Sequence, residues 1–328
     1  MALTRMQVKN LTAKPETSPT KPSAVKPDAL SKKIIPWLEV NNPKAPISDT
    51  VGRHASQLDH CLEGLDHWSK VTGTAIVSTT VARAESLYPE LMRSKPETLR
   101  IIGGLKTHVL PGASPKDERP YDFADAEGWK AIAESVRSIA RLTGTNIVLL
   151  ENETALAPFH RDEADIDFKK FRAAFHPLRK TGIETWWMFP NVLSDPPRRR
   201  RERTTRLLEA VSQTLPDARF IAAYVGWYDW KDDRVQTVLR EEMIRKVGQK
   251  RLREMIYVRE DGYIRYSALK KRRCFTVEEA SRHIAVLPGD AVIVYPGAIQ
   301  WITIAKQWAR RASQTRWRRR HGSDAGAD

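Results

Sequence analysis

Two carboxylates and an amide directly follow an apolar run in the segment GTNIVLLENETAL, residues 144–156. The run is Ile147 to Leu150, and Glu151, Asn152 and Glu153 come next. Four consecutive apolar residues predict a buried strand. Carboxylates at the end of such a strand can move protons or attack an electrophilic carbon. This strand end is therefore the first candidate for an active site.

Carboxylates, amides, indoles and phenols also gather where other apolar runs end. The mixture suits a sugar, because hydroxyls need polar partners and C–H faces stack on aromatic rings. We therefore predict a carbohydrate or glycoside substrate and no cofactor. Of the consecutive pair Trp186 and Trp187, at least one is expected in the core, because neighbouring side chains of a strand face opposite ways. The substrate-binding candidates are Glu39, Asn41, Lys106, His108, Glu151, Asn152, Trp187, Trp227, Tyr228, Asp229, Arg259 and Tyr295.

The elements that must position these residues alternate between apolar runs and helical patterns. Eight such strand–helix units predict an α/β fold, the (β/α)₈ TIM barrel, as a single domain. Strands buried on both faces explain why the runs do not alternate cleanly between apolar and polar residues. A doubly wound open sheet is the rival, although the chain has neither a GxGxxG nor a GxxxxGK[ST] motif. The predicted strands are 34–40, 74–81, 99–107, 146–152, 183–189, 220–227, 254–260 and 291–297.

Two of the predicted helices end in glycine. The apolar residues of segment 125–144 recur with helical spacing, and Gly144 can provide the left-handed stop. A second helix is expected to end at Gly182, kinked or shortened by Pro177. In a barrel of this kind the active site lies at the C-terminal ends of the strands, so the polar strand ends are predicted to converge on one pocket.

Two strand ends carry a resemblance to a family. NIVLLENE resembles the fourth strand of the retaining glycoside hydrolases with a (β/α)₈ barrel, and IYVREDG is similar to their seventh. The resemblance implies that Glu153 is the acid/base, that Asn152 contacts the sugar 2-hydroxyl and that Glu260 is the nucleophile. It also implies supporting roles for His108, Tyr228 and Trp301. Glu151 remains an alternative to Glu153 as the acid.

Three other interpretations stay open. Lys106 could form a Schiff base in a lyase or aldolase. Carboxylates and histidines such as Glu39, Glu151, His108 and His160 could hold magnesium or manganese, whereas the absence of HxH and HExxH motifs disfavours zinc. The barrel could also bind a carbohydrate or an anionic ligand without catalysis, using for example the arginines of the run 198–203.

Charge and composition divide the chain of 328 residues with formal net charge +15 into three parts. Residues 1–31 and 313–328 are predicted to be disordered basic tails and 32–312 the barrel. The tails could bind nucleic acid or another polyanion. Cys61 and Cys274 are too few for a disulfide framework, which favours a cytoplasmic location. With neither a secretory signal nor a membrane-spanning run predicted, we expect no membrane partner.

Overall fold

The computed structural model describes part of the chain. The described residues are 34–41, 43–44, 56–107, 126–151, 172–173, 175–188, 208–209, 211–224, 243–267, 270–287, 291–296 and 300–321.

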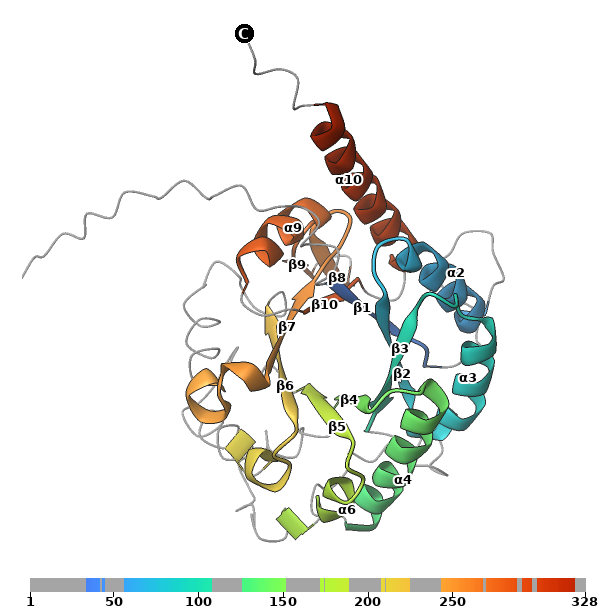
Figure 1. Cartoon of the computed structure of the whole chain (residues 1–328), viewed down its shortest axis with the longest axis vertical. Helices are drawn as coiled ribbons and strands as arrows, with labels where there is room; N and C mark the ends of the chain where they lie inside the picture. Colours follow the sequence, from blue (N-terminus) through green and yellow to red (C-terminus); the bar gives the residue numbers. More distant parts are fainter. Residues whose placement is uncertain are drawn as a thin grey trace, which may run out of the picture.

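Eight parallel strands close into a barrel, with helices on the outside (Figure 1). Around the barrel the order is β1-β10-β7-β6-β5-β4-β3-β2, so strands that follow each other in this set of eight are neighbours. All eight predicted runs are strands, and the predicted (β/α)₈ TIM barrel is confirmed. The strands are β1 (Ile34–Glu39), β2 (Thr74–Thr80), β3 (Arg100–Lys106), β4 (Ile147–Glu151), β5 (Glu184–Met188), β6 (Arg219–Tyr224), β7 (Leu252–Tyr257) and β10 (Val292–Tyr295).

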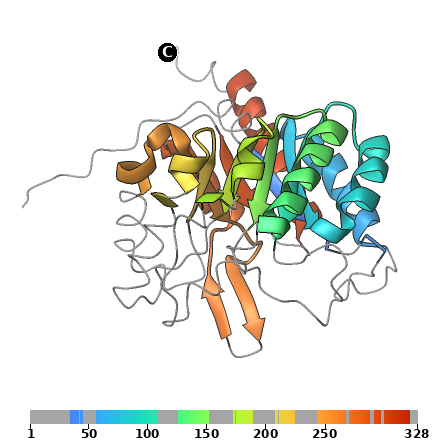
Figure 2. The same ribbon diagram turned by 90° about the horizontal axis from the view of Figure 1, so that it is seen from below.

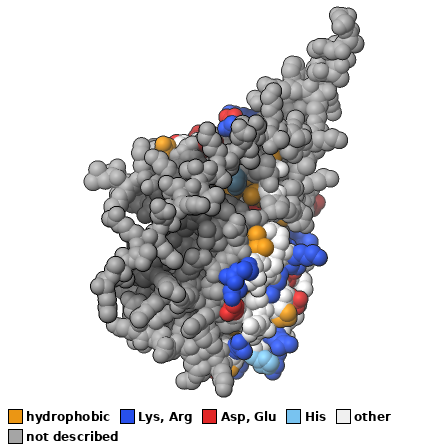
Figure 3. All heavy atoms as spheres, turned by 90° about the vertical axis from the view of Figure 1, so that its left-hand side faces the viewer, with side chains coloured by type: hydrophobic (Ala, Val, Ile, Leu, Met, Phe, Trp, Pro, Cys, Tyr) orange, Lys and Arg blue, Asp and Glu red, His pale blue; other side chains and the backbone are white. Residues whose placement is uncertain are grey.

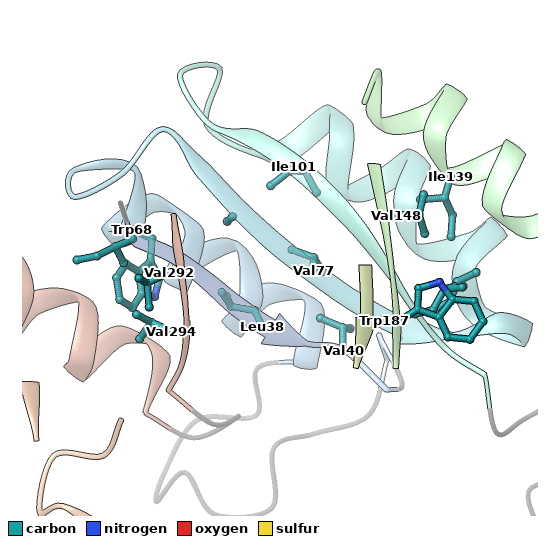
Figure 4. Packing of buried hydrophobic residues seen from close by; sticks show 14 of the residues in the cluster. Leu38, Val40, Trp68, Val77, Ile101, Ile139, Val148, Trp187, Val292 and Val294 are labelled. Carbon is teal, nitrogen blue, oxygen red and sulfur yellow. The ribbon is translucent and has the colours of Figure 1, made fainter. Parts of the chain in front are cut away.

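The strands bury both of their faces, as the barrel interpretation requires. An outer cluster lies between the strands and the helices and includes Leu38, Val77 and Val148 (Figure 4). A separate inner cluster fills the barrel and includes Trp37, Ile76 and Leu149. Because alternate residues of each strand enter these two apolar layers, the strand sequences show continuous apolar runs.

The helices follow the strands and cover the barrel wall. They are α2 (Gln57–Ser69), α3 (Val81–Ser94), α4 (Ala126–Thr143), α6 (His176–Arg179), α9 (Val277–Val286) and α10 (Trp301–His321), with a 3₁₀ turn η3 (Gln249–Arg251) before β7. Ser56 and Asp59 form a capping box at the start of α2, which satisfies backbone N–H groups that the helix itself cannot pair. Gly144 and Gly182 have φ values of 64° and 66°, so both predicted left-handed stops are confirmed.

Two glycines of β3 let the layers approach closely. A Cβ atom on Gly103 would lie 2.1 Å from Cγ2 of Ile139 on α4, and one on Gly104 would lie 2.6 Å from Cβ of Ser78. The absence of a side chain at Gly103 therefore lets α4 pack closely against the outer face of the sheet. Gly104 leaves room inside the barrel.

The sequence did not predict the antiparallel hairpin of β8 (Tyr263–Ser267) and β9 (Lys270–Arg273). It lies between β7 and α9 along the chain and projects away from the barrel on the side opposite to the free end of α10 (Figure 2). β8 also begins only six residues beyond the end of β7, so the hairpin starts close to the C-terminal end of that strand.

The helix α10 packs against α2 with its first half and then extends beyond the barrel (Figure 1). It continues to His321, so the predicted start of a tail at residue 313 falls inside a helix. Within the described ranges no helix is long and apolar enough to cross a membrane.

Candidate functional site at the barrel mouth

Three charged residues meet at the C-terminal end of the barrel. Nζ of Lys106 lies 2.9 Å from Oε2 of Glu39 and 3.7 Å from Oε1 of Glu151. Each of the three side chains keeps only 10–13% of its surface exposed. We call Glu39, Lys106 and Glu151 the mouth triad.

Strand geometry explains why these three residues point into the barrel. Each is the last residue of its strand, and each continues the alternation of the inner cluster, as Ile35, Trp37 and Glu39 do along β1. Lys106 on β3 is in register with Glu151 on β4. Glu39 lies two strands away on β1, and the long lysine side chain spans this gap.

Small residues below the triad leave space for that span. On β2 the inward residue in register with Glu39 is Ser78, and its partner in register on β3 is Gly104. Oγ of Ser78 accepts a hydrogen bond of 2.7 Å from the indole N–H of Trp37. The Trp37 indole is therefore fixed as the floor of the mouth, with its polar atom satisfied.

Aromatic rings line one side of the mouth. Tyr295 on β10 contacts Trp37 and Tyr257, with ring centroids 5.2 and 5.1 Å apart and edge-to-face geometry. Its hydroxyl donates a hydrogen bond to Glu39. Burial raises the pKa of Tyr295 well above its ordinary value, and the negative charge of Glu39 raises it further. Tyr295 therefore stays protonated at neutral pH and serves as a donor to Glu39.

The two carboxylates of the triad stand in different surroundings. Glu39 receives the shorter contact from Lys106 and a hydrogen bond from Tyr295. Glu151 lies farther from the Lys106 nitrogen. A pair of carboxylates with unequal surroundings is what acid–base chemistry needs, because one must stay ionised while the other carries a proton.

The opposite end of the barrel is closed by different contacts. Glu184 at the start of β5 accepts hydrogen bonds from Trp186 at 2.7 Å and from Arg219 at 3.2 Å. The guanidinium of Arg253 lies 5.3 Å from the centroid of a Trp186 ring. Glu184, Trp186 and Arg219 thus pair with one another, which is expected of the N-terminal face of a barrel, where residues contribute to stability.

The structure brings together four of the residues that the sequence singled out, namely Glu39, Lys106, Glu151 and Tyr295. Asn41 is exposed. The guanidinium of Arg259 donates to the carbonyl of Pro296. Trp187 is buried outside the barrel wall, where it contacts Trp129 and Phe175 at 5.6 and 5.2 Å, so it belongs to the core. The expectation that at least one residue of the pair 186–187 is core is confirmed.

Glu260 lies in a different environment from the mouth triad. It is exposed, its backbone N–H donates to Oε1 of Gln300, and its Oε1 accepts from Nε2 of Gln307 on α10 at 3.4 Å. Trp301 is also part of the helix layer, because it is buried and stacks on His60 of α2. The remaining predicted residues lie outside the described residues: His108, Asn152, Glu153, His160, the run 198–203, Trp227, Tyr228 and Asp229.

Sequence reasoning missed Trp37, Ser78 and Tyr257 as parts of the mouth. Each lies on the inward face of its strand, Trp37 and Ser78 two positions before the strand end and Tyr257 at the end itself. Counting alternate residues back from Glu39 and Tyr295 would have found Trp37 and pointed to the inner layer. Among the described residues no group of three or more His, Cys, Asp or Glu side chains could hold a metal ion.

Comparison with solved structures finds the same barrel in proteins of different activity. A proposed α-L-fucosidase from Bacteroides thetaiotaomicron superposes with a TM-score of 0.51 at 10% identity, covering 92% of this chain and 99% of its own. The spore cortex-lytic enzyme SleL of Bacillus cereus gives 0.50 at 8% identity, over 84% and 75% of the two chains. A xylose isomerase domain protein of Salmonella typhimurium gives 0.48 at 8% identity, over 90% and 99%. No family model and no curated protein matches the chain. The likeness defines a TIM-barrel protein, and its activity must be argued from the site.

Proposed function

We propose that the protein hydrolyses a glycosidic bond with retention of configuration, using Glu39 and Glu151. The observation that carries this proposal is the approach of both carboxylates to one nitrogen of Lys106, at 2.9 and 3.7 Å. The sum of these distances is the upper limit for the separation of the two oxygens. The spacing of roughly 5–5.5 Å between the two carboxyl groups of retaining glycosidases lies below this limit.

The unequal surroundings of the two carboxylates assign their roles. Glu39 is the nucleophile, because it makes the shorter contact with Lys106 and accepts a hydrogen bond from Tyr295. Glu151 is the acid/base, because it is buried and lies farther from the cation. The rings of Trp37, Tyr257 and Tyr295 offer apolar surface beside these groups.

The reaction follows in two displacements. Glu39 forms a bond to the anomeric carbon while the glycosidic C–O bond breaks and Glu151 protonates the departing oxygen. Water then attacks the glycosyl ester, Glu151 accepts the proton of the water, and the bond to Glu39 breaks. The ammonium group of Lys106 contacts both carboxylates, so it holds them in position and offsets the repulsion between their charges.

A panel of aryl glycosides tests this proposal. Wild type should hydrolyse at least one of them, and Glu39→Gln should lower kcat by about 10³-fold or more, the scale of losing a catalytic group that acts in the transition state. Glu151→Gln should be least damaged on substrates with an activated leaving group, which need little protonation. The matched control is Glu184→Gln, which removes an ion-paired carboxylate from the opposite end of the barrel and should retain activity.

The family resemblance names a different pair, Glu153 and Glu260, and the same assay separates the two assignments. Glu153→Gln and Glu260→Gln should retain most of the activity if the mouth triad performs the chemistry. Loss of activity in both, with Glu39→Gln unaffected, would favour the pair named by the resemblance.

A second candidate function rests on the burial of Lys106 at the mouth. A buried lysine can attack a carbonyl and form a Schiff base. Here two carboxylates stabilise the ammonium form, which is not nucleophilic, so hydrolysis remains the first choice. Borohydride reduction in the presence of carbonyl sugars would decide, because only a Schiff base leaves a stable adduct on Lys106.

A further inference from the structure

The β8–β9 hairpin is a strongly basic part of the chain. The eleven residues from Tyr263 to Arg273, YIRYSALKKRR, contain no acidic residue. On the face that Figure 3 shows, by contrast, Lys and Arg side chains are interspersed with acidic and hydrophobic ones. The five cations of the hairpin are Arg265, Lys270, Lys271, Arg272 and Arg273.

The pairing of the two strands distributes these cations over both faces of the ribbon. Tyr263 is opposite Arg273, and Arg265 is opposite Lys271. Ile264 is opposite Arg272, one position along and therefore on the other face. The hairpin thus combines five cations with no acidic residue, and such an excess of positive charge attracts an anionic partner.

Backbone hydrogen bonds fasten the base of the hairpin to the end of β7. The N–H of Phe275 donates to the carbonyl of Tyr257 at 3.2 Å, and the N–H of Cys274 donates to the carbonyl of Gly262 at 2.8 Å. The N–H of Arg259 donates to the carbonyl of Phe275 at 2.9 Å, beside the parallel bridge between Val258 and Phe275. Tyr257 is thus both a ring of the mouth and an anchor of the hairpin. The ribbon projects outward from this anchor (Figure 2).

We infer that the hairpin holds an anionic glycan, carboxylated or sulfated, whose neighbouring sugar occupies the barrel mouth. This inference rests on the proposed function for the choice of a glycan. The mouth offers no excess positive charge to an anionic sugar, because Lys106 already lies against Glu39 and Glu151, whereas a basic arm rooted at the rim would attract the sugars that lie farther along the chain.

Binding measurements without turnover test this inference. Isothermal titration calorimetry would use oligosaccharides of polygalacturonate and of heparin, with cellohexaose as the neutral probe and duplex DNA as the competing polyanion. The hairpin variant replaces Arg265, Lys270, Lys271, Arg272 and Arg273 by Ser. The matched control replaces five exposed cations of α3 and α4 by Ser, namely Arg83, Arg93, Lys130, Arg137 and Arg141.

Wild type should bind one of the two anionic glycans, and the hairpin variant should bind it about 10-fold more weakly or worse, with the difference shrinking at high salt. The control variant should bind like wild type. Thermal melts of both variants, and a milder variant with only Lys270→Ser and Lys271→Ser, show whether a loss reflects unfolding. Preference for polygalacturonate or for heparin identifies the carboxylated or the sulfated source.

Equal binding by wild type and a folded hairpin variant would overturn the inference, and so would equal or tighter binding of cellohexaose. Hairpin-dependent binding of DNA in preference to both glycans would overturn it in favour of a nucleic acid. Repeating the titration with Glu39→Gln separates the two proposals. Hairpin-dependent glycan binding by a protein that hydrolyses no glycoside would support the inference and remove the proposed hydrolysis.

Discussion

At the scale of single residues, Lys106 is the group on which the mouth depends for stability. Its ammonium group is the cation that contacts both Glu39 and Glu151. Lys106→Met would leave two largely buried carboxylates facing each other. We expect a loss of unfolding free energy of about 3 kcal/mol, the lower end of the cost of removing one partner from a buried pair, because a tenth of each side chain remains exposed.

Urea unfolding of Lys106→Met beside Lys70→Met would check this. Lys70 pairs with Asp66 on the surface of α2, with more than half of each side chain exposed, and its loss should change the unfolding free energy by less than about 0.5 kcal/mol. Equal effects of the two substitutions would show that the triad contributes no more than a surface pair.

Tyr295 makes the free energy of unfolding depend on pH in the alkaline range. Its pKa is raised in the folded state above the unfolded value of about 10. The unfolded state therefore loses this proton first, so the contribution of Tyr295 is complete below about pH 10 and is lost as the pH rises further.

Tyr295→Phe has no such proton. We expect the variant to be less stable than wild type at pH 8, because Glu39 loses a hydrogen bond, and the gap to narrow above about pH 10. Equilibrium unfolding at both pH values measures the gap. A gap that is constant or widens would mean that the hydroxyl of Tyr295 is not buried against Glu39.

At the scale of elements, the contact between β3 and α4 depends on the missing side chain of Gly103. Gly103→Ala would push a methyl group against Ile139, at 2.1 Å, and against the hydroxyl of Tyr88, at 3.2 Å. We expect a cost of about 1–3 kcal/mol, the usual range for overpacking. In an Ile139→Ala background the same substitution should cost less, because the clashing methyl group is gone.

A double-mutant cycle followed by denaturant unfolding measures this coupling. Gly73→Ala is the matched control, because a Cβ atom there meets nothing within 4 Å. Additive effects of Gly103→Ala and Ile139→Ala would contradict the close approach of the strand and the helix.

The elements of the barrel could be predicted from sequence because they are regular. Each strand is a short apolar run, and Gly144 and Gly182 mark helix ends. The hairpin could not be found in this way. Tyr263 to Ser267 is a mixed polar segment held by pairing with a second mixed segment, and such long-range pairing leaves no apolar period in either strand. The end of α10 was also missed, because a polar arginine-rich segment has the composition of a tail.

At the scale of the whole molecule, closure of the barrel brings residues at the ends of different strands together in one site. Glu39, Glu151 and Lys106 were predicted to converge because parallel strands end on the same side, and in the structure Lys106 contacts both carboxylates. The side to which the Glu260 side chain points could not be predicted, because Glu260 lies in a turn after β7, where the alternation of the strand no longer applies. The pairing of Glu39 with Lys106 also escaped prediction, because it depends on the order of strands around the barrel and on Gly104 between them.

Covalent trapping of the nucleophile tests the central claim, that the mouth triad is the catalytic centre, most directly. A 2-deoxy-2-fluoro glycoside with a good leaving group, of the sugar that the aryl panel identifies, slows the second displacement and leaves the sugar on the attacking carboxylate. Mass spectrometry of peptides should find the label on Glu39 in wild type and in Glu184→Gln, and none in Glu39→Gln. A label on Glu260, or labelling that persists in Glu39→Gln, would contradict the account.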